Sequence, residues 1–333
     1  MLAYSGWQNS GNCDLNTTTA SAPPHVRRIS VVVPVYRDAD RTIALVQALQ
    51  TQRLNPGTHI EIIIVDDGSN DGSVGRMEKS IGEMATVRKL STNSGRSIAR
   101  NAGVRQADGE LLLFMDSDCL PADAGFIAAL AQRFDGDVVA CTGPVRGTGR
   151  GFWHAFQVDA ATRRAALHAR GVSYAGSTAN LMVRRECFEA IGGLDETYRA
   201  YGFEDRDLLI RLAALGPIAW ADDAVVEHHD DLDLAAVCRK MREAGAGGSQ
   251  RFAERHPDAY RALGYAALDA SVHPWRGQLV RMLSPLLSPT IAATSAALEW
   301  HWLPFALRRF AVRALSGASY LLGTSEPGAT MDK

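Results

Sequence analysis

Residues 111–120 read LLLFMDSDCL, a short apolar run that leads directly into two carboxylates. Such a run predicts a buried central strand that ends near Asp116 and Asp118. If strand geometry persists, both carboxylates point to the same side, because side chains alternate along a strand. Open α/β sheets bind ligands at this end of their strands, and neighbouring carboxylates repel unless a cation lies between them. The stretch therefore predicts a divalent-metal site, and a solvated Asp-Ser turn is the alternative.

The chain on the amino-terminal side of this stretch alternates between strand and helix patterns. We expect strands at 29–33, where Pro34 ends the run, at 60–65 and at 87–90, with helices around 43–49 and 97–107. This rhythm predicts a mostly parallel sheet with helices on both faces. Asp67 and Gly95 then lie just beyond strand ends, as Asp116 and Asp118 do. Four polar features at one edge indicate a binding site there.

The chain after Asp118 supplies further candidate segments. A helix is expected at 125–134 and a strand at 138–142, and the glycine-rich, basic segment 143–151 is expected to be mobile. Residues 176–183 read GSTANLMV within a strand-like context. Its small residues leave room for a ligand, or they allow tight packing of a strand against a helix.

Acidic residues open a later helix, in the sequence GFEDRD at 202–207. The helix dipole favours acids at this position, but three acids in four residues exceed what capping requires. A last strand at 225–227 precedes His228 and His229. Alternation predicts that only one of these two imidazoles faces the site.

The composition limits the class of protein. The 333 residues are sufficient for one large domain with an extension, and 46% hydrophobic content excludes wholesale disorder. Lysine and arginine number 35 against 37 aspartate and glutamate, so the net charge gives no argument for nucleic acid. The five cysteines are odd in number and never spaced C-x-x-C, which favours a reducing compartment over disulfides or zinc. The first 25 residues read as a flexible leader without signal-peptide order.

The last third of the chain is expected to be helical from about Leu232. Arg239, Lys240 and Arg242 would give its first helix a basic face near the site. Residues 282–298 carry no charge, but Pro285 and Pro289 are expected to break this stretch, which is shorter than the roughly 20 residues that span a bilayer.

Tryptophans and arginines follow that uncharged stretch. Trp300 and Trp302 lie shortly before Arg308, Arg309 and Arg313, a combination typical of helices in a membrane interface. We predict a monotopic membrane attachment. The alternative is an apolar helical hairpin that packs on the catalytic domain or forms a dimer interface.

Taken together, these segments resemble the family-2 glycosyltransferases with the GT-A fold. The matching pieces, in order, are VVVPVY, IIIVDDGS, NSGRSIARNAG, LLFMDSD, GSTANLMVRR, GGLDE, GFEDRDLLIRL and VVEHH. The resemblance implies a Rossmann-like, mostly parallel sheet with a C-terminal helical extension. We expect a leader at 1–27, a catalytic domain at 28–250 and a helical extension at 251–333.

The resemblance also implies roles for single residues. Those assigned to the nucleotide are Pro34, Tyr36, Asp67, Gly95, Arg100 and Asp116. The residues implied for the metal, Mn²⁺ or Mg²⁺, are Asp118, His228 and, as an alternative to its ribose contact, Asp116. The donor and acceptor pocket would include Gly176, Ser177 and Asn180. Asp205 would be the general base, and its neighbour Glu204 is the other candidate.

The implied activity is transfer of a sugar from a nucleotide-diphosphate sugar to a hydroxyl of a carbohydrate or lipid-linked acceptor. One base and one displacement predict inversion at the anomeric carbon. A lipid-phosphate sugar synthase is the nearest alternative. A nucleotidyltransferase is disfavoured because residues 34–40, PVYRDAD, lack the glycine-rich loop of that class. A binding module that has lost catalysis is disfavoured because Asp118, Asp205 and His228 are all present. We expect a cytoplasmic protein, peripheral to the inner face of the membrane, that does not bind nucleic acid.

Overall fold

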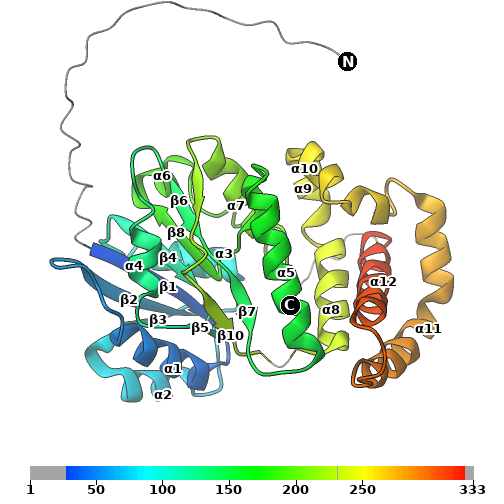
Figure 1. Cartoon of the computed structure of the whole chain (residues 1–333), viewed down its shortest axis with the longest axis horizontal. Helices are drawn as coiled ribbons and strands as arrows, with labels where there is room; N and C mark the ends of the chain where they lie inside the picture. The colour runs from blue at the N-terminus through cyan, green and yellow to red at the C-terminus, as the bar shows by residue number, and fades with distance from the viewer. Residues whose placement is uncertain (1–27, 231, 327–333) are drawn as a thin grey trace, which may run out of the picture.

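The computed structural model describes residues 28–230 and 232–326, so the predicted leader lies outside the described residues. The central feature is a seven-stranded sheet with the order β3-β2-β1-β4-β8-β6-β9 (Figure 1). Its strands are β1 (Arg28–Val35), β2 (His59–Asp66), β3 (Thr86–Lys89), β4 (Leu111–Met115), β6 (Ala140–Thr142), β8 (Asn180–Arg184) and β9 (Ile218–Trp220). Neighbouring strands are parallel except where β8 pairs with β4 and with β6.

Side-chain alternation along the central strands explains why both faces of the sheet are covered. In β4, Leu111, Leu113 and Met115 join one hydrophobic cluster, whereas Leu112 and Phe114 join another. The first cluster includes residues of α1 (Ala39–Gln50), α2 (Ser73–Ile81) and α4 (Phe126–Ala131). The second includes residues of α3 (Arg96–Val104), α6 (Arg185–Ala190) and α7 (Glu204–Ala213). The predicted fold class, a mostly parallel sheet between helical layers, is confirmed.

A second, smaller sheet lies beside the carboxyl end of β4. It has the order β5-β10-β7, with β5 (Cys119–Pro121), β7 (Val145–Gly147) and β10 (Val226–His228). In the antiparallel register of β5 and β10, His228 lies opposite Cys119. The strand β7 falls within the glycine-rich segment 143–151, so the expectation that this segment is mobile was wrong for its centre.

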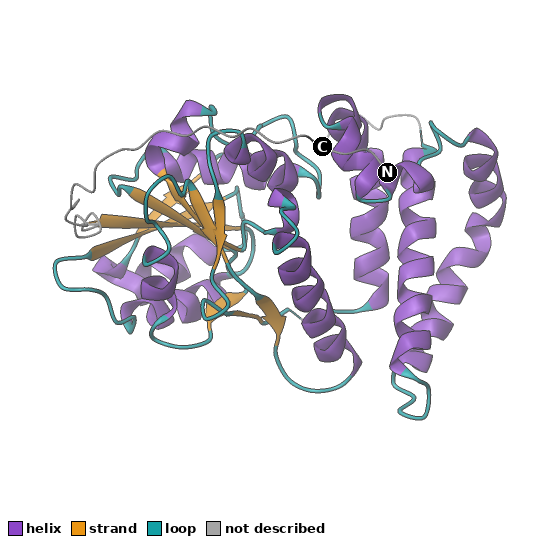
Figure 2. Cartoon of the chain, turned by 45° about the horizontal axis from the view of Figure 1, so that its top comes forward, coloured by secondary structure: helices purple, strands orange, loops and turns teal. Residues whose placement is uncertain are grey.

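The rest of the described chain is helical and packs beside the sheet domain (Figure 2). Its helices are α8 (Leu234–Ala246), α9 (Ser249–Arg255), α10 (Pro257–Ala262), α11 (Pro274–Leu298) and α12 (Phe305–Thr324). The helix α5 (Phe152–His168), which has no counterpart among the expected elements, joins this region to the sheet. Phe152 packs in one cluster with Leu234 of α8 and Val312 of α12. Short 3-10 turns occur at η1 (Gly82–Met84), η2 (Ser173–Ala175) and η3 (Tyr265–Leu268).

Three prolines lie inside elements that we expected them to end. Pro34 is within β1, where the pairing with β4 has already stopped at Val32 and only β2 remains as a partner. Pro285 and Pro289 lie inside α11, and the expected break does not occur. In a helix without proline, the backbone N–H of residue 285 would donate to the carbonyl of Arg281. Proline has no N–H, and this carbonyl accepts a hydrogen bond from the Ser284 hydroxyl at 2.8 Å instead. Since α11 is largely exposed, solvent can satisfy the other affected groups.

Candidate functional site

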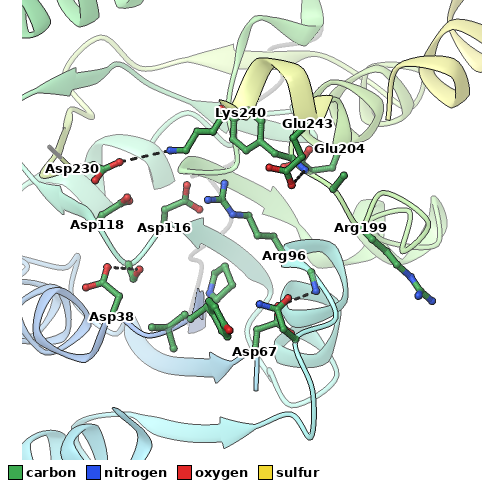
Figure 3. A pocket seen from close by; sticks show the side chains of 18 of the residues that line it. Asp38, Asp67, Arg96, Asp116, Asp118, Arg199, Glu204, Asp230, Lys240 and Glu243 are labelled. Atoms are coloured by element: carbon green, nitrogen blue, oxygen red, sulfur yellow. Dashed lines mark hydrogen bonds and ion pairs between the residues drawn. The ribbon is translucent and has the colours of Figure 1, made fainter. Parts of the chain in front are cut away.

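A cavity of about 640 Å³ opens where β1, β2 and β4 end (Figure 3). This volume lies within the usual range for small-molecule sites. The predicted site residues that line it are Pro34, Tyr36, Asp67, Gly95, Asp116, Asp118 and Glu204. Arg100, Asp205, His228, Gly176, Ser177 and Asn180 do not line it. The structure therefore separates the predicted residues into those that face the cavity and those that lie beside or beneath it.

Asp67 joins the end of β2 to the beginning of α3. Its carboxylate accepts hydrogen bonds from the backbone N–H groups of Ser94, at 2.8 Å, and Gly95, at 2.9 Å. Gly95 has a φ of +100°, and a Cβ there would lie 3.0 Å from the carbonyl oxygen of Arg199. Glycine is therefore required at this position, both by its conformation and by the space available. The exposed ring of Tyr36 lines the same cavity.

The Asp116-Ser117-Asp118 segment is a turn, so the strand geometry that would point both carboxylates to the same side does not persist through it. The turn is closed by a hydrogen bond from the Cys119 N–H to the Asp116 carbonyl at 3.1 Å. Consequently the two carboxylates have different partners. Asp116 accepts a hydrogen bond at 2.5 Å from Arg100, whose side chain is 1% exposed and lies beneath the cavity.

Asp118 has an imidazole partner from the small sheet. His228 Nε2 lies 3.3 Å from Asp118 Oδ2, and Gln157 Nε2 lies 3.2 Å from His228 Nδ1. Burial is the largest single influence and raises the pKa of Asp118, but the hydrogen bond and charge of His228, together with the charge of Arg96, lower it to about 2. His229 is placed elsewhere, with its Nε2 3.7 Å from Glu227. His228 is thus the imidazole beside Asp118.

These donors fit a divalent cation such as Mn²⁺. Potential ligand atoms of Asp118, Cys119 and His228 all lie within 4.8 Å of one another. Oxygen and imidazole nitrogen suit Mn²⁺, and Mg²⁺ would depend more on the carboxylate and water. Burial, with the nearby Asp116 and Asp118, raises the pKa of the Cys119 thiol well above its usual value. Cys119 therefore stays protonated near neutral pH, and Asp118 and His228 are the residues that would hold the ion.

Glu204 and Asp205 begin α7, but their carboxylates have different surroundings. Glu204 is 7% exposed, lines the cavity and has one buried oxygen, Oε2, without a hydrogen-bond partner among the described residues. Burial, reinforced by the charge of Asp205, raises the pKa of Glu204 to about 7. Asp205 instead accepts hydrogen bonds from the hydroxyls of Ser177, at 3.1 Å, and Thr178, at 2.6 Å.

The GSTAN segment is therefore beside Asp205, with mixed roles for its residues. Ser177 contacts the candidate base directly. Gly176 packs on Thr142 of β6, where a Cβ would lie 3.0 Å from that side chain. Asn180 is fully buried and donates to the carbonyls of Pro144 and Ala224. Packing thus accounts for the small residue at 176. Within the strand-like stretch 176–183, the strand β8 begins only at Asn180.

Arg96 and Tyr201 also line the cavity, although neither was among the predicted site residues. The Arg96 guanidinium lies 5.6 Å from the Tyr201 ring centroid, and Lys240 Nζ of α8 lies 5.7 Å from it. No carboxylate of the described chain forms an ion pair with Arg96, which points into the cavity beside Asp116 (Figure 3). The available signal was the position of Arg96 after Gly95, at the start of a helix. The expected basic face of α8 is present at Arg239 and Lys240.

Comparison with known proteins gives a consistent picture. The family model described as glycosyl transferase family 2 matches residues 30–192. Glycosyltransferase AglE of Haloferax volcanii is 27% identical over 172 residues, which are 49% of this chain and 55% of that protein. An uncharacterized glycosyltransferase of Haemophilus influenzae is 28% identical over 191 residues, 55% of this chain and 61% of that one. The chain thus spans less than two thirds of the length of either relative.

One solved structure shares the fold over most of the chain. It is a mannosyltransferase from Pyrobaculum calidifontis in complex with GDP-Man and Mn²⁺, with a TM-score of 0.58 and 19% identity. The likeness covers 90% of this chain and 88% of that one. At this identity it establishes the GT-A fold alone. Residues 30–192 match the glycosyl transferase family 2 model, and the related sequences are glycosyltransferases, so this part of the chain is a family-2 glycosyltransferase domain.

Proposed function

We propose that the protein is a metal-dependent, inverting glycosyltransferase. It would move a sugar from a nucleotide-diphosphate sugar to a hydroxyl of a carbohydrate or lipid-linked acceptor. One observation carries this proposal: Asp118 and Glu204 come from distant segments but line the same cavity. His228 is the partner of Asp118, and Asp205 is the neighbour of Glu204 in the sequence. A cation site and a candidate base that each adjoin one cavity are what group transfer from a diphosphate requires.

The nucleotide is assigned to the side of the cavity formed by β1 and β2. Tyr36 offers an exposed ring for stacking on the base, and Asp67, fixed by two backbone N–H groups, offers its remaining lone pairs to it. Arg96 and Lys240 supply positive charge to the same cavity. These cations would face the diphosphate and balance the surrounding carboxylates.

The leaving group and the nucleophile are assigned to opposite parts of the site. Asp118 and His228 would hold Mn²⁺ or Mg²⁺, which supplies Lewis-acid neutralisation of the diphosphate charge. Asp205 would take the proton of the acceptor hydroxyl as the new C–O bond forms and the bond to the diphosphate breaks. Support for Asp205 comes from the family resemblance and from the Ser177 and Thr178 hydroxyls, which orient its carboxylate. Glu204, which lines the cavity and has one buried oxygen without a hydrogen-bond partner among the described residues, is the other candidate.

We place this activity in the cytoplasm, at the inner face of a membrane. All four cysteines of the described chain, Cys119, Cys141, Cys187 and Cys238, are free, as expected in a reducing compartment. The lipid-phosphate synthase remains the alternative, because such an enzyme would use the same donor side. Its phosphate acceptor would need no base, so dependence on Asp205 distinguishes the two.

The test is to incubate the purified protein with a panel of nucleotide-diphosphate sugars and Mn²⁺, and to measure released nucleoside diphosphate. We expect slow hydrolysis of one donor, abolished by chelation of the metal and by Asp118→Asn. Asp205→Asn should retain donor binding, measured by calorimetry, but lose about 100-fold or more of the transfer rate. Release from no donor in the panel, or full activity of both variants, would contradict the proposal.

A further inference from the structure

The outer surface of α11 and α12 is unusually apolar. The six most exposed large hydrophobic side chains of the described residues all lie on this pair of helices and the loop between them. They are Trp275, Met282, Leu286, Trp302, Leu307 and Phe310, which are 58% to 78% exposed. We call these six residues the hairpin surface. An exposed apolar patch of this kind marks an interaction site in a soluble domain.

The helix α11 contributes most of its length to this surface. Of its 25 residues, only Gly277 and Leu298 are buried. Trp275, Met282 and Leu286 follow one another at spacings of seven and four, so they share one helical face. In Figure 1, α11 lies at the end of the molecule farthest from the sheet, outside α12. Nothing in the described chain covers this face.

The charges beside the hairpin surface are almost all positive. Between residues 274 and 313 the sequence contains five arginines, a single glutamate, Glu299, and neither lysine nor aspartate. Arg309 is paired with Asp159 at 2.7 Å. Arg281 and Arg313 are exposed, and neither forms an ion pair with any residue of the described chain. Two free cations therefore flank the apolar side chains.

The loop between the two helices adds a paired aromatic tip. The Trp300 and Trp302 rings stack with centroids 5.5 Å apart, and they are 49% and 74% exposed. Tryptophan next to arginine is characteristic of the boundary between lipid headgroups and acyl chains. A second copy of the chain would place like charges opposite one another, whereas anionic headgroups would neutralise them.

We propose that the hairpin surface lies in the interface of an anionic lipid bilayer. Met282, Trp302 and Phe310 would enter the acyl boundary, and Arg281 and Arg313 would contact the headgroups. No described helix is both long and apolar enough to cross a membrane. The attachment is accordingly in the plane of the interface, and its affinity combines apolar burial with charge attraction.

Point variants test this proposal better than a deletion, because α12 also has a buried face. Val312, Tyr320 and Leu322 of that helix are buried in the helical region. The test variant is the triple change Met282→Ser, Trp302→Ser and Phe310→Ser in the full chain. The matched control is Met84→Ser, Leu167→Ser and Leu215→Ser, which removes three exposed apolar side chains from other surfaces. The charge variant is Arg281→Glu with Arg313→Glu.

Each protein is mixed with phosphatidylcholine vesicles, with or without phosphatidylglycerol, and the bound fraction is measured by flotation. We expect the wild type and the control triple to float with anionic vesicles, more weakly at high salt. The hairpin triple should bind about tenfold or more weakly, since one such buried side chain contributes ~1.5 kcal/mol or more. The charge variant should lose its preference for anionic vesicles.

Three results would overturn the proposal. One is absence of wild-type flotation, and another is equal binding by the hairpin triple. The third is a dimer in size-exclusion chromatography that only the hairpin triple converts to a monomer, since the surface would then be a protein interface. Thermal unfolding verifies that the variants fold. Flotation requires no sugar transfer, so its outcome is independent of the proposed activity.

Discussion

Glu204 is the carboxyl group whose ionisation should be visible in the pH dependence of the enzyme. It lines the cavity, and burial together with Asp205 raises its pKa to about 7. It is neutral below that pH and adds a negative charge to the cavity above it. Because the donor is proposed to be an anionic diphosphate, this charge should oppose donor binding.

We therefore expect the KM for the donor to rise as the pH increases through about 7, and Glu204→Gln to remove this rise.

The free energy of unfolding should also depend on the ionisation of Glu204. A pKa raised above its unfolded value means that folding loses stability as pH rises between about 4.3 and the folded value. The melting temperature of Glu204→Gln should lack that decline. The checks are KM measured across pH and thermal unfolding across pH.

The comparison with Asp205→Asn identifies the base. Under our assignment, Glu204→Gln retains far more transfer than Asp205→Asn does at pH 6 to 7. Loss of transfer in Glu204→Gln alone, with activity retained in Asp205→Asn, would instead make Glu204 the base.

Sequence reasoning located the residue types of the site better than their partners. It placed Asp67, Gly95, Asp116 and Asp118 at one edge of the sheet, and all four line the cavity. It could not show that a turn at 116–119 directs Asp116 to Arg100 and Asp118 to His228, because a turn and a continued strand have the same sequence pattern here. The roles of these residues remain predictions.

At the level of elements, prolines and long-range pairings were the main sources of error. The sequence rule that proline ends a strand or helix failed at Pro34, which has a partner strand on one side only, and at Pro285, where a serine hydroxyl satisfies the freed carbonyl. The helix α5 has an almost evenly distributed apolar pattern, with only Phe152 and Ala161 buried. It therefore gave no clear periodic signal.

The contact between α8 and α12 allows a prediction about helix packing. A Cβ at Gly323 would lie 2.1 Å from the Arg242 carbonyl oxygen, and one at Gly245 would lie 2.4 Å from the Tyr320 carbonyl oxygen. Both obstacles are backbone atoms, so relaxation requires the helices to separate. We expect Gly323→Ala to lower the free energy of unfolding by about 1–3 kcal/mol.

The control is Gly75→Ala in α2, where a Cβ meets nothing within 4 Å. Higher helix propensity should make that change stabilising by up to about 1 kcal/mol. Denaturant unfolding measures both variants. Stabilisation by Gly323→Ala would show that the two helices do not approach as closely as described.

For the whole molecule, the helices after residue 250 do not line the cavity, but α12 packs against a helix that does. Arg239 and Lys240 of α8 line the cavity, and α8 is held by α12 through the close contacts just described. The domain boundary at 250 stays a prediction, and α12 returns across that position to pack on α8. No local pattern indicates such a return, since it depends on which distant helices pack together.

Deletion of residues 274–333 should consequently damage the catalytic part of the protein. We expect a lower melting temperature and a weaker affinity for the nucleotide-sugar donor than in the full chain, measured by thermal unfolding and calorimetry. The hairpin triple serves as the control and should match the wild type in both. Unchanged stability and donor affinity after deletion would mean that α8 holds its position without α12.

The ladder between β5 and β10 also has a consequence for the order of folding. It sets His228 opposite Cys119, and the His229 N–H donates to the Asp118 carbonyl at 2.7 Å. A slip of one residue would turn His228 away, because neighbouring side chains face opposite sides. The two proposed metal ligands therefore meet only after strands far apart in the sequence have paired in register. Acquisition of metal affinity during refolding would thus time the closure of this ladder, a late and non-local event.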